Sequence, residues 1–179
     1  MLIKNTDNQF GLIAIILHWV MAILIIGLSA IGLYMTGLPI SLQKLKLYGW
    51  HKEYGLLVLL LVVIRFSWRL ANKLPKLPDT IPRWQQMAAL SVHFAFYFFM
   101  FALPITGWLL TSATGLPVSF FGLFVLPDLV SADVTLRDNL ILVHQWLGYG
   151  LIAAILMHIG ATAQHYVVHK DNILRRMWL

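Results

Sequence analysis

The sequence predicts an all-α integral membrane protein, a four-helix bundle with both termini in the cytoplasm. Hydrophobic residues make up 60% of the 179 residues and charged residues 11%, against roughly 45–50% apolar residues in soluble chains even when glycine is counted. Long uncharged stretches recur, and about 20 residues at 1.5 Å each suffice to cross the hydrocarbon core. We therefore expect a single domain, residues 1–179, that crosses the membrane four times.

The first and third spans are defined by the absence of charge. Residues 10–35 contain no Asp, Glu, Lys or Arg, and this stretch is too long for the apolar core of a signal peptide, about 7–15 residues. No charged side chain occurs between Arg83 and Asp128. Residues 87–110 fill one crossing there before Gly115 and Pro117 interrupt it.

The fourth span, residues 140–168, lies between Asp138 and Lys170. The second, residues 48–68, has an uncharged core of only 11 residues, 54–64, a length that also suits a buried soluble helix or an interfacial segment. Four crossings place both termini on one side, and the positive-inside rule makes that side the cytoplasm. The predicted inner cations are Lys4, Arg65, Arg69, Lys73, Lys76, Arg83, Lys170, Arg175 and Arg176, and the outer ones are Lys44, Lys46, Lys52 and Arg137.

The composition limits the possible chemistry. The formal charge of +6 reflects membrane topology in so apolar a chain, and no basic patch with interleaved aromatic residues indicates nucleic-acid binding. The chain has no cysteine, which excludes disulfides, iron–sulfur clusters, thiolate zinc sites and c-type haem attachment. Any metal must therefore rely on the seven histidines.

Four of these histidines are predicted to lie inside spans at two matched depths. His144 and His158 are 14 residues apart in one helix, which returns them to within about 40° of one face and separates them by roughly 21 Å. Counted from the helix ends, His18 is level with His158 near the inner side, and His51 is level with His144 near the outer side. An ionisable residue inside a span requires a partner.

Two histidine pairs across a bundle suit two haems, since a haem iron accepts axial imidazoles from both faces of its flat ring. Structural, hydrogen-bonded histidines and a transported divalent cation remain the alternatives. None of the seven Asp and Glu residues lies in the middle of a predicted span, which argues against a cation pathway.

The other candidate residues are secondary. His165 could contact a haem propionate, and His93 suits either a quinone hydrogen bond or an ordinary polar contact. Arg65 and Arg69 fit topology, propionate binding or lipid binding. The outer cations could steer a small anion toward His51 and His144; these are Lys44, Lys46, Lys52 and Arg137.

Several motifs together resemble the bacterial cytochrome b561 family over essentially the whole chain. They are His18-Trp19, His51 at the start of the second span, His93 followed by residues 102–107 (ALPITG), the spacing of His144 and His158, and the closing residues 170–177 (KDNILRRM).

The resemblance implies an inner-membrane protein that holds two b-type haems, with His18, His51, His144 and His158 as ligands. Family members pass single electrons to or from the quinone pool, and one branch oxidises superoxide on the periplasmic side and reduces ubiquinone. This chain departs from that branch in having Ala89 early in the third span and few cations in its outer loop.

We therefore expect a dihaem cytochrome that oxidises superoxide and reduces ubiquinone, surrounded by membrane lipid. The alternative is a haem-b membrane anchor that relays electrons between quinone and a soluble redox partner protein, a dehydrogenase or hydrogenase. A histidine-lined metal transporter is a third hypothesis.

Overall fold

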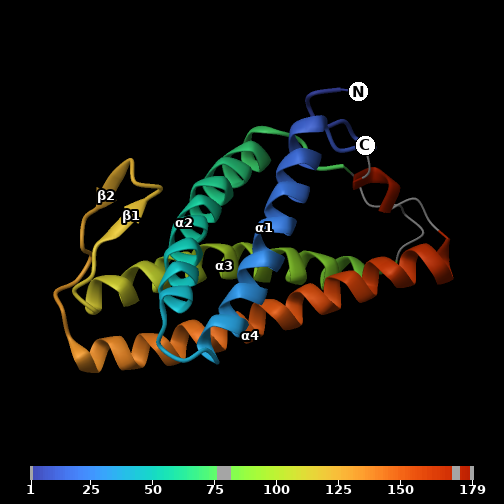
Figure 1. Ribbon diagram of the computed structural model, residues 1–179. Helices are drawn as coiled ribbons and strands as arrows, with labels where there is room; N and C mark the ends of the chain where they lie inside the picture. The colour runs from blue at the N-terminus through green and yellow to red at the C-terminus, as the bar shows by residue number, and fades with distance from the viewer. Residues whose placement is uncertain (1, 76–81, 171–173, 178–179) are drawn as a thin grey trace.

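The computed structural model describes residues 2–75, 82–170 and 174–177, without the side chains of His169 and Arg175. Lys76, counted above among the inner cations, lies outside this description. Within it, four helices are long and apolar enough to cross a membrane, and Figure 1 shows α1 and α2 lying across the α3 and α4 pair. The helices are α1 Leu12–Thr36, α2 Leu42–Ala71, α3 Arg83–Ala113 and α4 Val134–Gln164.

The second helix, the least certain in the sequence, is a continuous helix of 30 residues. It begins earlier than the apolar stretch because Ser41 caps it, with its Oγ accepting from the backbone N–H of Lys44 at 3.2 Å. α4 also begins before its predicted span, where an oxygen of Asp133 accepts from the N–H of Leu136 at 2.8 Å. Polar caps thus extend both helices beyond their apolar segments.

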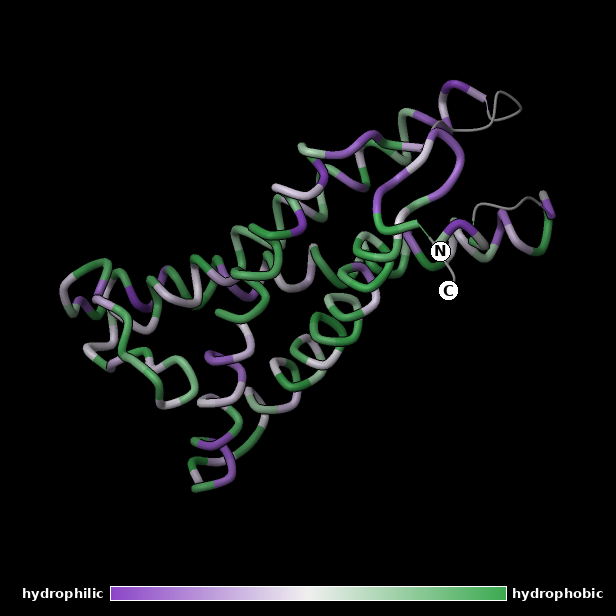
Figure 2. The backbone as a smooth tube through the Cα atoms, turned by 90° about the horizontal axis from the view of Figure 1, so that it is seen from above, coloured by the Kyte–Doolittle hydropathy of each residue, from purple (hydrophilic) through white to green (hydrophobic). Residues whose placement is uncertain are grey.

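The buried core joins α1, α2 and α3 and is small. Met21, Val58, Val62 and Met100 form it, with partly buried aromatic side chains of α3 around them. No residue of α4 belongs to this cluster, although α4 packs along α3. The remaining helix surfaces are mostly hydrophobic in Figure 2, as expected for contact with lipid.

A proline interrupts the hydrogen bonding of α3 in its C-terminal half. Pro104 lies inside the helix and has no N–H to donate to the preceding turn. The Thr106 hydroxyl donates to the carbonyl of Leu103 at 2.9 Å, and Gly107 follows it. This irregular turn faces α4, where it contacts a histidine described below.

The loop after α3 forms a β-hairpin. Strands β1 (Val118–Phe120) and β2 (Phe124–Leu126) pair antiparallel. Phe121 and Gly122 both have positive φ, 50° and 71°, and Gly122 supplies the left-handed conformation at no steric cost. The Phe121 ring packs edge-on against Tyr54 of α2 at 5.2 Å. We call this end of the molecule the hairpin end.

The N-terminal segment and the short 3₁₀ helix η2 (Leu174–Met177) lie at the opposite end (Figure 1), which we call the terminal end. Asn5 joins the N-terminal segment to the residues after α2, donating from its side chain to the carbonyl of Lys73 at 2.9 Å. Trp19 of α1 donates from its indole N–H to the carbonyl of Met177 at 2.7 Å. Four crossings require the termini to share one side of a membrane, and these contacts agree with that arrangement.

Candidate functional site

The structure brings the four span histidines together as two pairs. At the terminal end, His18 of α1 faces His158 of α4, with 6.2 Å between the ring centroids and 63° between the ring planes. At the hairpin end, His51 of α2 faces His144 of α4, with corresponding values of 6.1 Å and 75°. These are the pairs that the depth count predicted.

The separation of the rings matches two imidazoles that share one metal ion. An imidazole nitrogen binds a transition metal at about 2 Å, and a ring with bonds of about 1.33 Å places its centre roughly 1.1 Å behind that nitrogen. Two such ligands on opposite sides of one ion have ring centres about 6.3 Å apart. Both observed distances, 6.2 and 6.1 Å, agree with this value.

Each histidine of the hairpin-end pair packs against a glycine of a neighbouring helix. A Cβ on Gly32 of α1 would stand 3.2 Å from Cε1 of His51, and one on Gly107 of α3 would stand 3.3 Å from Cε1 of His144. Both distances are shorter than ordinary van der Waals contact, so a side chain at either position would displace the ring. The absence of a side chain at Gly32 and Gly107 therefore determines where the imidazoles of His51 and His144 lie, and so how far apart the two rings are.

The hydrogen bonds of Thr106 determine which nitrogen of His144 carries the proton. The Thr106 hydroxyl has one proton, which it donates to the carbonyl of Leu103. Its oxygen lies 3.0 Å from Nδ1 of His144 and accepts there, and the backbone carbonyl of Leu103 also lies within hydrogen-bonding reach of this imidazole. Both acceptors favour a proton on Nδ1 and leave Nε2 with a free lone pair. That tautomer is the one that binds metal through Nε2.

The hydrogen-bond partner of His18 is Arg65, and it favours the other tautomer of the imidazole. Arg65 lies 3.2 Å from Nδ1 of His18, and a guanidinium can only donate. This contact requires an unprotonated Nδ1 and a proton on Nε2, so it is incompatible with coordination by Nε2. A metal at the terminal-end pair therefore requires Arg65 to move away from His18, toward any negative charge that the bound group carries.

Space for a flat group exists beside the hairpin-end pair. Gly55 and Gly148 each follow a histidine of this pair by one helical turn, and a Cβ at either would meet no atom within 4 Å. Nδ1 of His51 is buried without a hydrogen bond among the described residues, although the backbone carbonyl of Leu28 lies close to it. Together with the absence of α4 from the packed core, these features fit haem held between paired imidazoles.

Two other histidines lie near the terminal-end pair. The ring of His93 in α3 is 6.5 Å from that of His158, tilted by 55°, and its side chain is exposed. His165 begins η1, the π-helical turn His165–His169 that follows α4. In the described ranges, no three side chains among His, Cys, Asp and Glu are placed to hold a metal ion together, so the histidines are organised as pairs.

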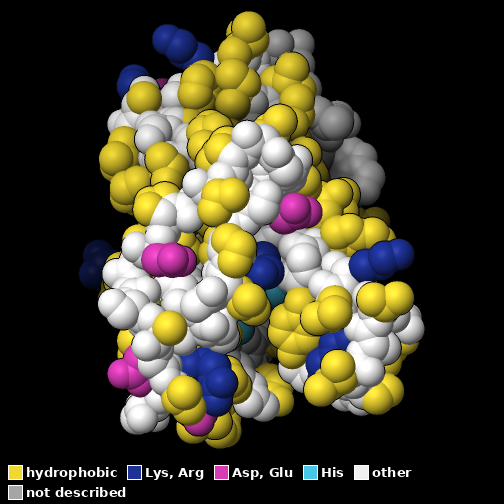
Figure 3. All heavy atoms as spheres, turned by 60° about the vertical axis from the view of Figure 1, so that its left-hand side comes forward, with side chains coloured by type: hydrophobic (Ala, Val, Ile, Leu, Met, Phe, Trp, Pro, Cys, Tyr) yellow, Lys and Arg dark blue, Asp and Glu magenta, His cyan; other side chains and the backbone are white. Residues whose placement is uncertain are grey.

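Cations surround the mouth at the hairpin end. Figure 3 shows a hollow on this face with histidine side chains inside it and Lys and Arg side chains around it. Lys44 and Lys46 lie in the first turns of α2, and Lys52 follows His51 directly. The Arg137 guanidinium pairs with Asp138 at 2.9 Å, which offsets its charge. Lys52 interacts electrostatically with Glu53, and the Lys44 ammonium donates to the carbonyl of Leu38 at 2.6 Å.

Sequence reasoning missed Gly32, Thr106 and Gly107 as neighbours of the histidines. Gly32 could have been found, since it follows His18 by 14 residues, the same spacing that separates His144 from His158. Thr106 and Gly107 belong to the 102–107 motif, but only the packing of α3 on α4 shows which ring they contact.

Comparison with known proteins points to one family. The family model described as prokaryotic cytochrome b561 matches residues 9–179. Cytochrome b561 homolog 2 of Escherichia coli K12 is 33% identical over 182 residues, which covers 97% of this chain and 93% of the relative. Cytochrome b561 homolog 1 of the same organism is 31% identical and covers 95% and 97%. The chain therefore belongs to the prokaryotic cytochrome b561 family and is a multi-pass bacterial membrane protein that carries b-type haem and serves electron transfer.

Proposed function

We propose that the chain holds two b-type haems and passes single electrons from superoxide at the hairpin end to ubiquinone in the membrane. The observation that carries this proposal is the pair of imidazole pairs, His51 with His144 and His18 with His158, each at the separation of two ligands on one metal ion. The hairpin end would face the periplasm and both termini the cytoplasm, in agreement with the distribution of Lys and Arg.

The four histidines would hold the two haems, and bound haem would supply a one-electron iron couple. With both histidines of each pair engaged in holding the haem, superoxide would donate its electron without binding to the metal. Thr106 keeps the proton of His144 on Nδ1, and Gly32 and Gly107 hold the two rings in place.

Superoxide is a small anion with one electron to give. Lys44, Lys46 and Lys52 would raise its local concentration at the mouth of the hairpin end. Two superoxide anions lose one electron each and leave as two molecules of dioxygen. One ubiquinone takes up these two electrons and two protons from the surrounding water and leaves as ubiquinol, so charge and atoms balance.

The haem-to-protein ratio of the purified chain, measured as the pyridine haemochromogen, tests this proposal together with a reduced-minus-oxidised spectrum after addition of superoxide. Two b haems that superoxide reduces, and ubiquinone reoxidises, would support it. A single haem would contradict the assignment of two pairs. Two haems that superoxide leaves oxidised would contradict the proposed donor.

A second candidate function is a haem-b anchor that relays electrons between a soluble dehydrogenase or hydrogenase and quinone. The hairpin favours it, because Leu123, Phe124 and Val125 are exposed at 76, 56 and 63% and could form part of a protein interface. Co-purification of a soluble oxidoreductase, together with quinone reduction that depends on it, would distinguish this function from the first.

A further inference from the structure

A cavity of about 580 Å³ lies between α2 and α3, and it is not part of either histidine pair. Its volume falls within the range of ligand pockets, about 300–1,000 Å³. Phe94 and Phe98 on its rim are exposed at 76 and 52%. These helix surfaces face lipid in a membrane, so a molecule dissolved in the bilayer could enter the cavity sideways.

Two parallel rows of α3 side chains line most of this cavity. One row has the four-residue spacing of a helix face and contains His93, Tyr97, Phe101 and Ile105. It is polar toward the terminal end and apolar toward the middle of the helix. The cavity therefore suits an elongated ligand with a polar head and an apolar tail.

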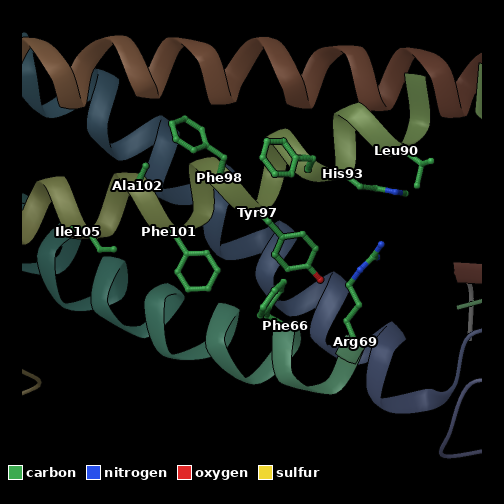
Figure 4. A pocket seen from close by; sticks show the side chains of 10 residues that line it. Phe66, Arg69, Leu90, His93, Tyr97, Phe98, Phe101, Ala102 and Ile105 are labelled. Carbon is green, nitrogen blue, oxygen red and sulfur yellow. The ribbon is translucent and has the colours of Figure 1, made fainter. Parts of the chain in front are cut away.

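Three polar side chains meet at the head of the cavity. Figure 4 shows the guanidinium of Arg69, the imidazole of His93 and the hydroxyl of Tyr97 directed toward one another. Arg69 stacks over the Tyr97 ring, 5.6 Å from its centroid. Among the described residues, neither Arg69 nor His93 makes a hydrogen bond or an ion pair.

These groups favour a ligand head that accepts hydrogen bonds. The Arg69 guanidinium can only donate. The Arg65 guanidinium lies beside the Tyr97 hydroxyl and can only donate to it, which leaves the hydroxyl proton free for a ligand. A quinone carbonyl is such an acceptor, and the aromatic rings of Phe66 and Phe101 flank the same space.

The head of the cavity also lies next to the terminal-end pair, since the rings of His93 and His158 are 6.5 Å apart. We propose that this α2–α3 cavity is the ubiquinone site, with Arg69, His93 and Tyr97 binding the quinone carbonyls and the aromatic row of α3 holding the start of the isoprenoid tail. The inference rests on the proposed function, because it locates the acceptor of that reaction.

The test measures binding directly. An azido-ubiquinone is photolysed with the haem-loaded protein in lipid nanodiscs, and the labelled residues are identified by mass spectrometry. We expect labels on residues 66–69 and 90–105, lost in the presence of excess ubiquinone and retained with excess phosphatidylglycerol. Labels that phosphatidylglycerol displaces equally well would overturn the inference and make the cavity a lipid acyl-chain site.

Two variants with matched controls make the test specific. Ala102→Phe fills the cavity, whereas Ala88→Phe adds the same ring at an exposed position of α3 outside it. Tyr97→Phe removes only the hydroxyl at the head, whereas Tyr149→Phe removes one that bonds only Gln145 on the surface of α4. We expect at least a tenfold loss of labelling for Ala102→Phe, a smaller loss for Tyr97→Phe, and no loss in either control.

The haem-to-protein ratio and the rate of haem reduction by superoxide are measured on the same samples, and both should be unchanged in all four variants. If both cavity variants label and reoxidise like their controls while wild-type protein binds ubiquinone, the location is wrong and the proposed function stands. If superoxide reduces the haems of wild-type protein but ubiquinone neither labels nor reoxidises it, the proposed acceptor fails, and this inference fails with it.

Discussion

Gly32 of α1 lies so close to His51 of α2 that a Cβ would stand 3.2 Å from the imidazole Cε1. The contact joins two helices at the hairpin end and sets the position of one ring of the His51–His144 pair. Since the paired rings are 6.1 Å apart, a displacement of a few tenths of an ångström is large on the scale of a metal–nitrogen bond, about 2 Å.

Replacing Gly32 by leucine should therefore remove the hairpin-end haem. The larger side chain has no room beside the ring and would push His51 out of line with His144. We expect the haem-to-protein ratio to fall by half. Gly27→Leu is the matched control, because a Cβ at Gly27 of the same helix meets nothing within 4 Å; an equal loss of haem there would show that the effect is not local.

Thr106→Val should weaken haem binding at the hairpin end and lower the stability of the correct tautomer of His144. Loss of such an outer hydrogen bond to a metal-ligating histidine costs about 10–100-fold in metal affinity. We expect Thr106→Ser to restore binding because it retains the hydroxyl. Thr111→Val is the control, since the Thr111 hydroxyl bonds only the carbonyl of Gly107; equal haem dissociation rates in both valine variants would contradict this role for Thr106.

Removal of single histidines should separate the two haem sites. His51→Ala or His144→Ala should empty only the hairpin-end site, and His18→Ala or His158→Ala only the terminal-end site. The haem spectra and haem-to-protein ratios of the four variants measure this. Loss of the haem at the opposite end would show that the pairing is wrong.

His93→Ala tests which histidine pairs with His158. His93 is 6.5 Å from His158 and His18 is 6.2 Å away, so distance alone separates them little. We expect His93→Ala to retain both haems, because His18 and not His93 is the proposed ligand, and to weaken azido-ubiquinone labelling. A chain with His93→Ala that has lost one haem, beside a His18→Ala chain that keeps both, would reverse the assignment.

Replacing Lys44, Lys46 and Lys52 together by glutamine should slow the oxidation of superoxide and flatten its dependence on ionic strength. Steering by fixed charges raises association rates by about 10–1,000-fold and is screened by salt, so we expect a loss of about tenfold or less for three exposed or half-buried lysines. Stopped-flow rates of haem reduction at several salt concentrations measure it. Arg137→Gln is the comparison, because the Arg137 charge is already offset by Asp138 and its loss should matter less.

Much of this arrangement could be predicted from spacing along single helices. The 14 residues between His144 and His158 indicate two levels on one face of α4, and uncharged stretches indicate the four helices. The limits of the helices could not be predicted from hydropathy, since Ser41 and Asp133 cap α2 and α4 through polar contacts outside the apolar segments.

Features that depend on contacts between helices could not be predicted from the sequence. His93 was a candidate for a quinone contact, but Arg69 belongs to another helix, and only the packing of α2 on α3 brings its guanidinium to the head of the same cavity. The tautomer of His144 likewise depends on the Pro104 turn of α3, where Thr106 bonds the carbonyl of Leu103. Both contacts join residues of different helices, so no regular spacing in the sequence indicates them.

One histidine of each pair belongs to α4, so this helix determines how far apart the two pairs lie. The spacing of His144 and His158 sets the separation of the two levels, about 21 Å of helix rise. One inserted residue between them would rotate one ring by about 100° away from its partner, whereas seven would return it to nearly the same face but lengthen the gap by about 10 Å. If each pair holds a haem, as proposed, the number of residues between His144 and His158 sets the distance that electrons cross between the two haems, and only insertions that return both rings to one face of α4 would keep the two pairs aligned.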